Sequence, residues 1–374
     1  MVLTEANLNK VNKVLNSEKD HALDNVHEED YFSDLPSKVD LKKVIPEGLF
    51  SKSLTKSTLY WLRDLLAISA TVYFYFKYQP AGWIYVLWAN VLGLLMWCTF
   101  MIGHDAGHGS FSDYQRLNFY VGLLSHGPLL VPFRQWKKSH QLHHLGHNSM
   151  SKDKSHSHYT FEGEGAYFLT RATPVFIPLG FGLFYLALGL NDGSHFSVNY
   201  YAKNRADKID NFLSILSCSI FLTLYYILLQ QEFFFCFGLP WLIYNGWVYS
   251  VTFLQHHHDN MTVYNDNDWD FMKGAVETID RNFGFGLDDL THNITNGHLV
   301  HHIFFTQIPH YNLMEATKYV RPVLGKYYKL ENKFWLRELI EDHFFFTRRS
   351  VFERKDGNWT YKKMFPDGKL SDIL

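Results

Sequence analysis

Cysteine is scarce in this chain of 374 residues, which contains only three copies. Because Cys98, Cys218 and Cys236 are scattered along apolar stretches, they predict neither a disulfide framework nor a zinc pattern. An excess of charge of one sign is also lacking, since the chain has 35 Lys and Arg residues and 37 Asp and Glu residues. This balance gives no electrostatic reason to expect nucleic acid as a partner.

A high mean hydropathy is lacking too, because the value of −0.17 is typical of a soluble protein. The average hides four apolar runs, at residues 61–78, 83–102, 212–229 and 233–254. Each run has about 18–22 residues, enough to cross about 30 Å of hydrocarbon as a helix. We therefore predict four transmembrane helices. A soluble protein with buried core helices is the alternative, and four such runs disfavour it.

Short turns pair these runs into two hairpins, one turning at residues 77–82 and the other at residues 230–232. With four crossings, both chain ends and the middle loop lie on one side of the membrane. The middle loop, between Gly103 and Asn211, holds ten Lys and Arg residues, whereas the opposite side holds only Lys77. The positive-inside rule therefore predicts that most of the polar chain lies in the cytosol.

The distribution of polar residues predicts three parts of the chain. Residues 1–47 are polar and charged, so we expect a partly disordered tail and no cleavable signal peptide there. Residues 48–335 are expected to form the membrane domain, and residues 336–374 a cytosolic extension. Two further apolar blocks, 119–133 and 174–190, indicate interfacial or re-entrant segments.

Histidine is the residue in excess, with 21 copies. Three clusters have a spacing of three or four residues, which places their imidazoles on one face of a helix. They are His104 and His108; His140, His143 and His144; and His298, His301 and His302.

Neutral imidazole binds iron, zinc, copper or nickel. Eight ligands are too many for one structural zinc ion, and they fit two metal ions with positions left open. All three clusters lie on the predicted cytosolic side. The predicted fold is therefore an all-α integral membrane protein of two hairpins with a cytosolic di-metal cap.

Histidines outside these clusters are also candidate metal ligands. His256 begins a run of three histidines at the end of the fourth apolar run, so we predict that it is a ninth ligand. His292, six residues before the third cluster, is a further candidate. Isolated histidines are interpreted as ordinary polar residues, namely His126, His195 and His343. Those that follow the second cluster are expected on the surface of a polar loop, namely His147, His156 and His158.

Histidine ligands need hydrogen-bond partners for their second ring nitrogen. Asp105, Asp280 and Asp289 are candidate acceptors for these nitrogens, and Asn296 could place an amide near the metals. A capping or surface role is the alternative for each carboxylate.

Several motifs together resemble one family. They are Gly-His-Asp-Ala-Gly-His-Gly-Ser-Phe-Ser-Asp (103–113), Gln-Trp-Lys-Lys-Ser-His-Gln-Leu-His-His (135–144), Asn-Asp-Gly-Ser-His-Phe (191–196), Thr-Ile-Asp-Arg (278–281), His-Asn-Ile-Thr-Asn-Gly-His-Leu-Val-His-His (292–302), Ile-Pro-His-Tyr (308–311) and Glu-Ala-Thr (315–317). Residues 35–335 resemble the membrane-bound fatty acid desaturases. The motifs are most similar to the methyl-end branch, which holds the Δ12 (omega-6) and omega-3 enzymes.

The resemblance implies an enzyme that inserts a cis double bond into an unsaturated acyl chain, on phospholipid or coenzyme A. It implies two iron ions held by the eight clustered histidines and His256, with O2 as co-substrate. Electrons would come from NADH through a reductase and cytochrome b5, at the endoplasmic reticulum. The chain departs from the family in having Ala106 where Cys is frequent, and in the two histidines after His256. No haem-binding His-Pro-Gly-Gly sequence is present, so an external electron donor is expected.

The choice of double-bond position stays open, with Δ12 action on oleoyl chains preferred and omega-3 action as the alternative. A related di-iron hydroxylase or a sphingolipid desaturase is a second alternative. A metal transporter without enzyme activity is a third. Transporters place ionisable ligands within their spans, and here the histidines lie beyond the apolar runs.

Overall fold

The structure is a computed structural model that describes residues 31–156, 158, 180–189, 192–258, 261–340, 351–354 and 356–361. Four long helices form its frame: α4 (Leu54–Tyr78), α5 (Gly82–His108), α9 (Arg205–Leu229) and α10 (Leu239–Gln255). The shorter helices are α3 (Lys38–Val44), α6 (Gln115–His126), α7 (Phe133–Gly146), α11 (Phe271–Val276), α12 (Leu287–Leu290), α13 (His298–Phe304), α14 (Leu313–Leu324) and α15 (Trp335–Leu339).

Each predicted apolar run lies in helical structure, and local signals set the helix ends. The Ser53 side chain caps α4 by accepting a hydrogen bond from the Lys56 amide. The helix stops at Gln79, which has a φ of 44° and precedes Pro80, a residue that cannot continue a helix. At the far end of α5, Gly109 adopts a φ of 76°, as is common just after a helix C-terminus.

The second hairpin is less regular than the first. The Asn204 side chain caps α9 by accepting a hydrogen bond from the Asp207 amide. After α9, a short 3-10 turn (Gln230–Glu232) leads into a π-helical turn (Phe234–Gly238) before α10 begins. The predicted fourth run is therefore helical throughout, but with two kinds of helix.

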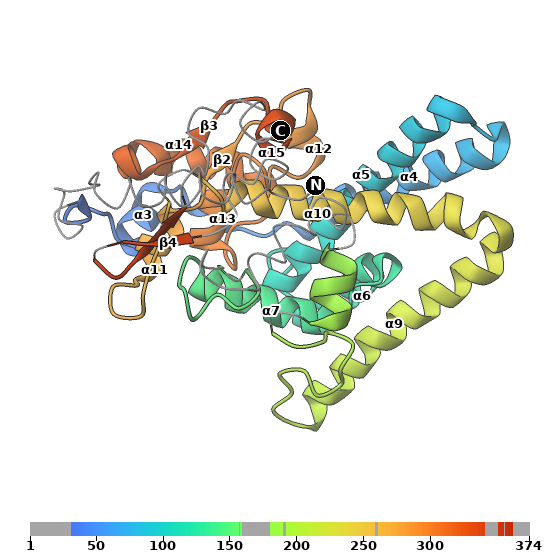
Figure 1. Cartoon of the computed structure of the whole chain (residues 1–374), viewed down its shortest axis with the longest axis horizontal. Coiled ribbons are helices and arrows are strands. Elements are labelled where there is room, and N and C mark those ends of the chain that lie inside the picture. The colour runs from blue at the N-terminus through green and yellow to red at the C-terminus, as the bar shows by residue number, and fades with distance from the viewer. Residues whose placement is uncertain are drawn as a thin grey trace, which may run out of the picture.

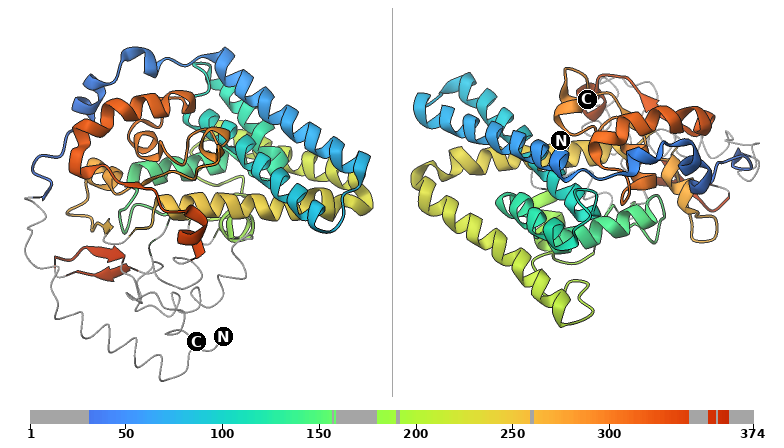
Figure 2. Two further views of the ribbon diagram at one scale, coloured as in Figure 1. Left: turned by 90° about the horizontal axis from the view of Figure 1, so that it is seen from above. Right: turned by 180° about the vertical axis from the view of Figure 1, so that it is seen from behind.

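Both hairpin tips lie at the same end of the molecule, away from the body that contains α13 and α14 (Figures 1 and 2). Hydrogen bonds join the tips: the Tyr75 hydroxyl donates to the Glu232 carboxylate at 2.5 Å, and the Tyr85 hydroxyl donates to the Phe235 carbonyl at 3.1 Å. The two hairpins therefore form one unit.

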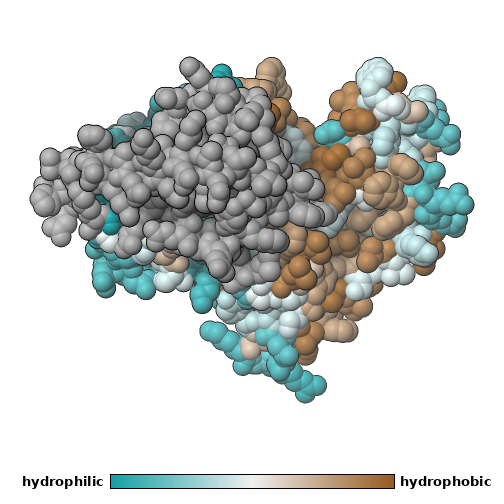
Figure 3. All heavy atoms as spheres, viewed as in Figure 1, coloured by the Kyte–Doolittle hydropathy of each residue, from teal (hydrophilic) through white to brown (hydrophobic). Residues whose placement is uncertain are grey.

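Exposed apolar side chains gather over these hairpins (Figure 3). Two stretches of the described chain, Gly82–His108 and Arg205–Glu232, are helices long and apolar enough to cross a membrane. Only 11% of the apolar window in the second stretch is buried within the protein, which is unusual for a water-facing helix. The helix α4 is less apolar because it carries Arg63 and Asp64, and α10 alone has 17 residues.

Two hydrophobic cores support the fold. One packs α5 against α10, with Phe100, Tyr244 and Leu254 almost fully buried. The other fills the body between α3, α13 and α14, and it includes Leu41 and Leu299. Because Leu41 is completely buried, the body extends into the predicted polar tail of residues 1–47. The tail boundary at residue 47 is thus too late in the sequence. Its helix α3 contributes only a few apolar residues, too few to stand out in a polar stretch.

Short strands depart from the all-α prediction. An antiparallel sheet has the order β1 (Thr262–Val263), β5 (Trp359–Tyr361), β4 (Val351–Glu353), with Thr360 opposite Thr262. A parallel pair joins β2 (Asp280–Arg281) to β3 (Leu330–Glu331), with Asp280 opposite Leu330. Strands of two or three residues are too short for an alternating pattern to reveal them. They attach the C-terminal extension to the body.

The two shorter apolar blocks lie against the hairpins. Within 119–133, Phe119 and Phe133 pack with Ile102 of α5. Of the block 174–190, the structure describes residues 180–189, which include a π-helix (Gly180–Leu188). Its Phe181 ring contacts the rings of Phe100 and Tyr244. This π-helix therefore adds to the core between α5 and α10.

Candidate metal centre

The three histidine clusters lie on three helices whose ends meet. His104 and His108 are in the last turns of α5, where the chain leaves the apolar hairpin. The second cluster lies on α7, and the third supplies three of the seven residues of α13. The predicted spacing along each helix therefore places the rings of each cluster on one side, facing the other two clusters.

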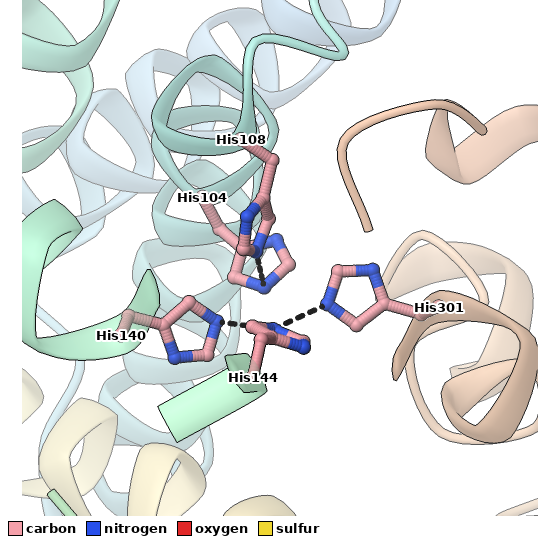
Figure 4. A group of neighbouring side chains, drawn as sticks. All are labelled: His104, His108, His140, His144 and His301. Atoms are coloured by element: carbon pink, nitrogen blue, oxygen red, sulfur yellow. Dashed lines mark hydrogen bonds between the residues drawn. The ribbon is translucent and has the colours of Figure 1, made fainter. Parts of the chain in front are cut away.

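The first imidazole group contains five histidines (Figure 4). Its members are His104, His108, His140, His144 and His301, and one nitrogen from each lies within 4.8 Å of the others. The Nε2 atoms of His104 and His108 are 3.2 Å apart, and that of His144 lies 3.1 Å from those of His140 and His301. Three helices far apart in sequence thus bring their Nε2 atoms together.

The second imidazole group lies beside the first. Ligating atoms of His143, His256 and His302 lie within 4.8 Å of one another. The Nε2 atom of His256 is 3.2 Å from those of both His143 and His298, so His298 completes a group of four. All nine histidines singled out from the sequence therefore fall into the two groups.

The nitrogen spacing fits metal coordination. With metal–nitrogen bonds of about 2.1 Å, neighbouring ligand nitrogens lie about 3 Å apart. Hydrogen bonds between rings cannot explain the whole arrangement, because a neutral imidazole has one donor and one acceptor nitrogen. Several Nε2 atoms converge here, and both ring nitrogens of the buried His302 have no hydrogen-bond partner in the described structure. The two groups therefore fit two metal ions.

The charge state of the rings also favours metal binding. Burial lowers the pKa of His144 and His302 well below its usual value, and nearby imidazoles lower it further. Burial likewise lowers the pKa of His298 to about 3. These three rings are therefore neutral at pH 7, and neutral imidazole is the form that binds a metal.

Carboxylates lie beside members of both groups. Nδ1 of His143 lies 2.9 Å from a carboxylate oxygen of Asp153, and Nδ1 of His104 lies 3.7 Å from Asp105. Asp105 also accepts a hydrogen bond from Nδ1 of His310 at 2.8 Å. Such partners fix which ring nitrogen is free for the metal. In Asp153, burial opposes the charge, but the attraction of His143 outweighs it and lowers the pKa.

The other predicted partners act differently. Asp280 does not contact a histidine ring, because its carboxylate accepts hydrogen bonds from the Leu299 amide at 2.8 Å and the Tyr328 hydroxyl at 2.7 Å. Burial raises the pKa of Asp280 to about 7. The Asp289 side chain is exposed, since it lies on the outer side of the short helix α12, so its predicted role as an acceptor is wrong. The Oδ1 atom of Asn296 is buried without a partner among the described residues.

Comparison with known proteins identifies the chain. Residues 80–335 match the model of the fatty acid desaturase family. The chain belongs to this family. It is 37% identical over 302 residues to the Delta(12) fatty acid desaturase fat-2 of Caenorhabditis elegans, covering 78% of this chain and 80% of that protein. It is 35% identical to the Delta(12)-fatty-acid desaturase of Arabidopsis thaliana, covering 79% and 83%. It is 33% identical to the omega-3 fatty acid desaturase fat-1 of C. elegans, covering 78% and 74%.

Three histidines of this desaturase lie deeper in the protein than their sequence context predicts. His147 and His158 are buried, and His156 is half-buried, so the prediction of surface positions is wrong. The loop after α7 folds back, because the Met150 amide donates to the Tyr264 carbonyl and the Tyr264 amide donates to the Asn148 carbonyl. As a result, the His147 ring lies 4.8 Å from that of His302, and the His156 ring lies 5.2 Å from that of His256.

The other predicted histidines that the structure describes lie outside both imidazole groups of the desaturase. His126 contacts the Phe100 carbonyl at 3.0 Å, and His195 lies 3.5 Å from Asp192, so both have polar neighbours as expected. His292 lies 2.8 Å from Asp64. His257 faces the Phe253 carbonyl at 2.8 Å, which leaves His256 as the histidine of its run that joins a group. His343 lies outside the described residues.

Two residues of the site, Asp153 and His310, are not among those predicted from the sequence. His310 lies in the motif 308–311, so the resemblance contained a signal for it. Asp153 lies ten residues after His143 in a polar loop, and only the tertiary fold brings its carboxylate to the ring.

Proposed function

We propose that this desaturase binds two iron ions at the two imidazole groups and inserts a cis double bond into an acyl lipid at the Δ12 position. The observation that carries the proposal is the convergence of nine imidazoles in two neighbouring groups. The Delta(12) enzymes of C. elegans and A. thaliana, at 37% and 35% identity, support the position of the double bond.

An unactivated methylene pair has no acidic proton, so acid–base residues alone cannot start the reaction. Two bound iron ions supply the O2-dependent oxidation that this substrate requires. The balance is –CH2–CH2– + O2 + 2 e⁻ + 2 H⁺ giving –CH=CH– + 2 H2O. The double bond takes the place of two C–H bonds, and both oxygen atoms leave as water.

The protein's own residues supply geometry and protection. The nine imidazoles would hold the ions, while Asp153 fixes the orientation of His143 and Asp105 lies 3.7 Å from His104. Eight of the nine rings belong to buried residues, and that of His140 is half-buried, so bulk water is largely excluded. The acyl chain has to approach from the apolar side, because the hairpin core begins one turn above the first group, at Phe100.

The proposed topology has four spans in two hairpins, with the metal centre on the cytosolic side of the endoplasmic reticulum. Two observations support it: both hairpin tips lie at one end, and the imidazole groups lie where α5 and α10 leave the hairpins. Electrons would come from NADH through a reductase and cytochrome b5, because O2 reduction requires two electrons that the acyl chain does not provide.

Omega-3 action is the second candidate, favoured by the 33% identity to the C. elegans omega-3 enzyme. Expression in yeast with supplied oleate or linoleate, followed by gas chromatography, separates the two. The proposal expects linoleate from oleate. Formation of α-linolenate from linoleate alone would favour the omega-3 assignment. A hydroxylated product, or purified protein without iron, would contradict the di-iron desaturase. Analysis of phospholipid and coenzyme A fractions would identify the carrier of the acyl chain.

A further inference from the structure

The second imidazole group joins two elements that end or begin at the metal centre. His256 immediately follows the last turn of α10, and His298 is the first residue of α13. Their Nε2 atoms lie 3.2 Å apart, although 42 residues separate them in sequence. Helix ends fray unless their free backbone groups are bound. Some other part of the chain therefore has to hold these two ends in register.

Arg281 binds the end of α10. Its Nε donates to the Leu254 carbonyl at 2.7 Å, and its Nη2 donates to the His257 carbonyl at 3.2 Å. These two carbonyls lie on either side of His256. A cation is favourable at a helix C-terminus, where backbone carbonyls have no partner in the helix. Arg281 is almost fully buried, and the buried Glu338 of α15 accepts a hydrogen bond from its Nη1.

Asp280, the neighbour of Arg281 on β2, binds the start of α13. Its Oδ1 accepts the Leu299 amide at 2.8 Å, next to His298, and so satisfies an amide that has no partner in the helix. Its Oδ2 accepts the Tyr328 hydroxyl at 2.7 Å, which fixes the carboxylate. The Asp280 carboxylate therefore binds a free backbone group at the start of α13, as the Arg281 guanidinium binds free backbone groups at the end of α10.

A shared carbonyl joins the two contacts. The Thr295 carbonyl, just before α13, accepts the backbone amide of Arg281 at 2.8 Å and Nε2 of Gln255 at 2.9 Å. Gln255 is the last residue of α10, and its carbonyl accepts the Ile279 amide at 3.1 Å. The strand β2 is thus bound to both elements through backbone and side chains.

We infer that Asp280 and Arg281 form a bracket that sets the distance between His256 and His298, and so the geometry of the second imidazole group. This inference rests on the proposed metal centre and assigns a role to the motif Thr-Ile-Asp-Arg (278–281). The bracket acts on the second group selectively. His256 and His298 both belong to that group, whereas His301, the member of the first group on α13, follows two residues after the Leu299 amide that Asp280 accepts.

The bracket residues are positioning residues, so the test needs a readout beyond activity. We would purify the full chain in detergent and measure iron per chain by mass spectrometry, together with product formation. In Arg281→Lys, a single ammonium cannot reproduce the fork that reaches both carbonyls and Glu338. The expected result is a fall from about two iron ions per chain to about one, with at least a tenfold loss of product.

Arg116→Lys is the matched control, because Arg116 is exposed on α6 and its described ion-pair partner is Asp210, at 3.7 Å, outside the bracket. It is expected to keep both ions and full activity. Asp280→Ala removes the acceptor for the Leu299 amide, whereas Asp280→Asn keeps a carbonyl oxygen there. The bracket therefore predicts loss of the second ion in Asp280→Ala and its recovery in Asp280→Asn.

Two retained ions in both Arg281→Lys and Asp280→Ala would overturn the inference. Equal loss of both ions would also overturn it, because the effect would not be selective. Iron binding by the unmodified chain without any double-bond formation would contradict the proposed function, while the ion count of the variants would still test the bracket. Absence of iron from the unmodified chain would overturn both.

Discussion

The two imidazole groups differ in how they are built. The first takes all five of its members from the three clusters, on the helices α5, α7 and α13. The second combines cluster members with His256, which follows a helix end, and it depends on Asp153 from a loop. The first group is therefore a product of helix packing. The second depends on how loops and helix ends are held, and we expect it to be the more easily lost.

Removal of one ring from either group should have the largest effect. In His301→Ala and His143→Ala, a missing ligand leaves a metal ion under-coordinated, so product formation should fall below detection. Iron content should show the difference between the groups: His301→Ala should lose the first ion and His143→Ala the second. Product analysis in yeast and iron per chain provide the measurement, with protein level as the control. Normal activity in either variant would refute the ligand assignment.

The carboxylates beside the ligands allow the two imidazole groups to be compared without removing a ligand. Asp153→Asn weakens the partner of His143 in the second group, and Asp105→Asn weakens that of His104 in the first. Loss of such a partner typically costs about 10–100-fold in metal affinity or activity. Because the Asp153 contact is shorter, 2.9 Å against 3.7 Å, Asp153→Asn should be the more damaging. The reverse order, measured as product yield, would contradict the proposed weakness of the second group.

Chelation should distinguish the groups without mutation. In the proposed centre, five imidazoles would hold the first ion and four would hold the second, so a chelator should remove iron in two phases, beginning with the second group. A ligand present at a thousand times its dissociation constant stabilises a protein by about 4 kcal/mol. The thermal unfolding midpoint should therefore fall in two steps as iron is removed. A single step in both measurements would indicate that the two ions are held equally.

His292→Asn should have the smallest effect. His292 is the first residue of the motif 292–302 but lies outside both groups, and its φ of 62° is one that Asn adopts readily. The variant should retain two iron ions and activity within about twofold. Loss of an ion would return His292 to the set of ligands.

The same variant has a predictable effect on acid stability. Burial lowers the pKa of His292 to about 4, whereas an unfolded histidine titrates near 6.5. Below pH 6.5 the unfolded chain binds the additional proton, so the contribution of His292 to stability is present above pH 6.5 and is lost as pH falls toward 4. The pH dependence of unfolding of His292→Asn should be shallower by one proton. An identical slope would indicate that His292 is protonated in the folded protein.

The spacing of residues along a single helix could be predicted from the sequence. The contacts between segments distant in the sequence could not. The histidine clusters and the apolar runs depend on neighbours three or four residues apart, which a sequence displays directly. The buried positions of His147 and Asp153 arise because a loop turns back onto α7 and pairs with the segment before α11. Nothing in their local pattern distinguishes them from residues of an exposed polar loop.

By itself, the sequence determined the family, the helical character of the four apolar runs and the histidines that come together. These features follow from local periodicity and from motifs that are contiguous in the chain. Only the tertiary structure decided how nine rings divide into two groups, which carboxylates orient them, and that Asp280 contacts a helix end instead of a ring. Contacts of that kind join residues tens to hundreds of positions apart, and their geometry is set by the packing of whole elements.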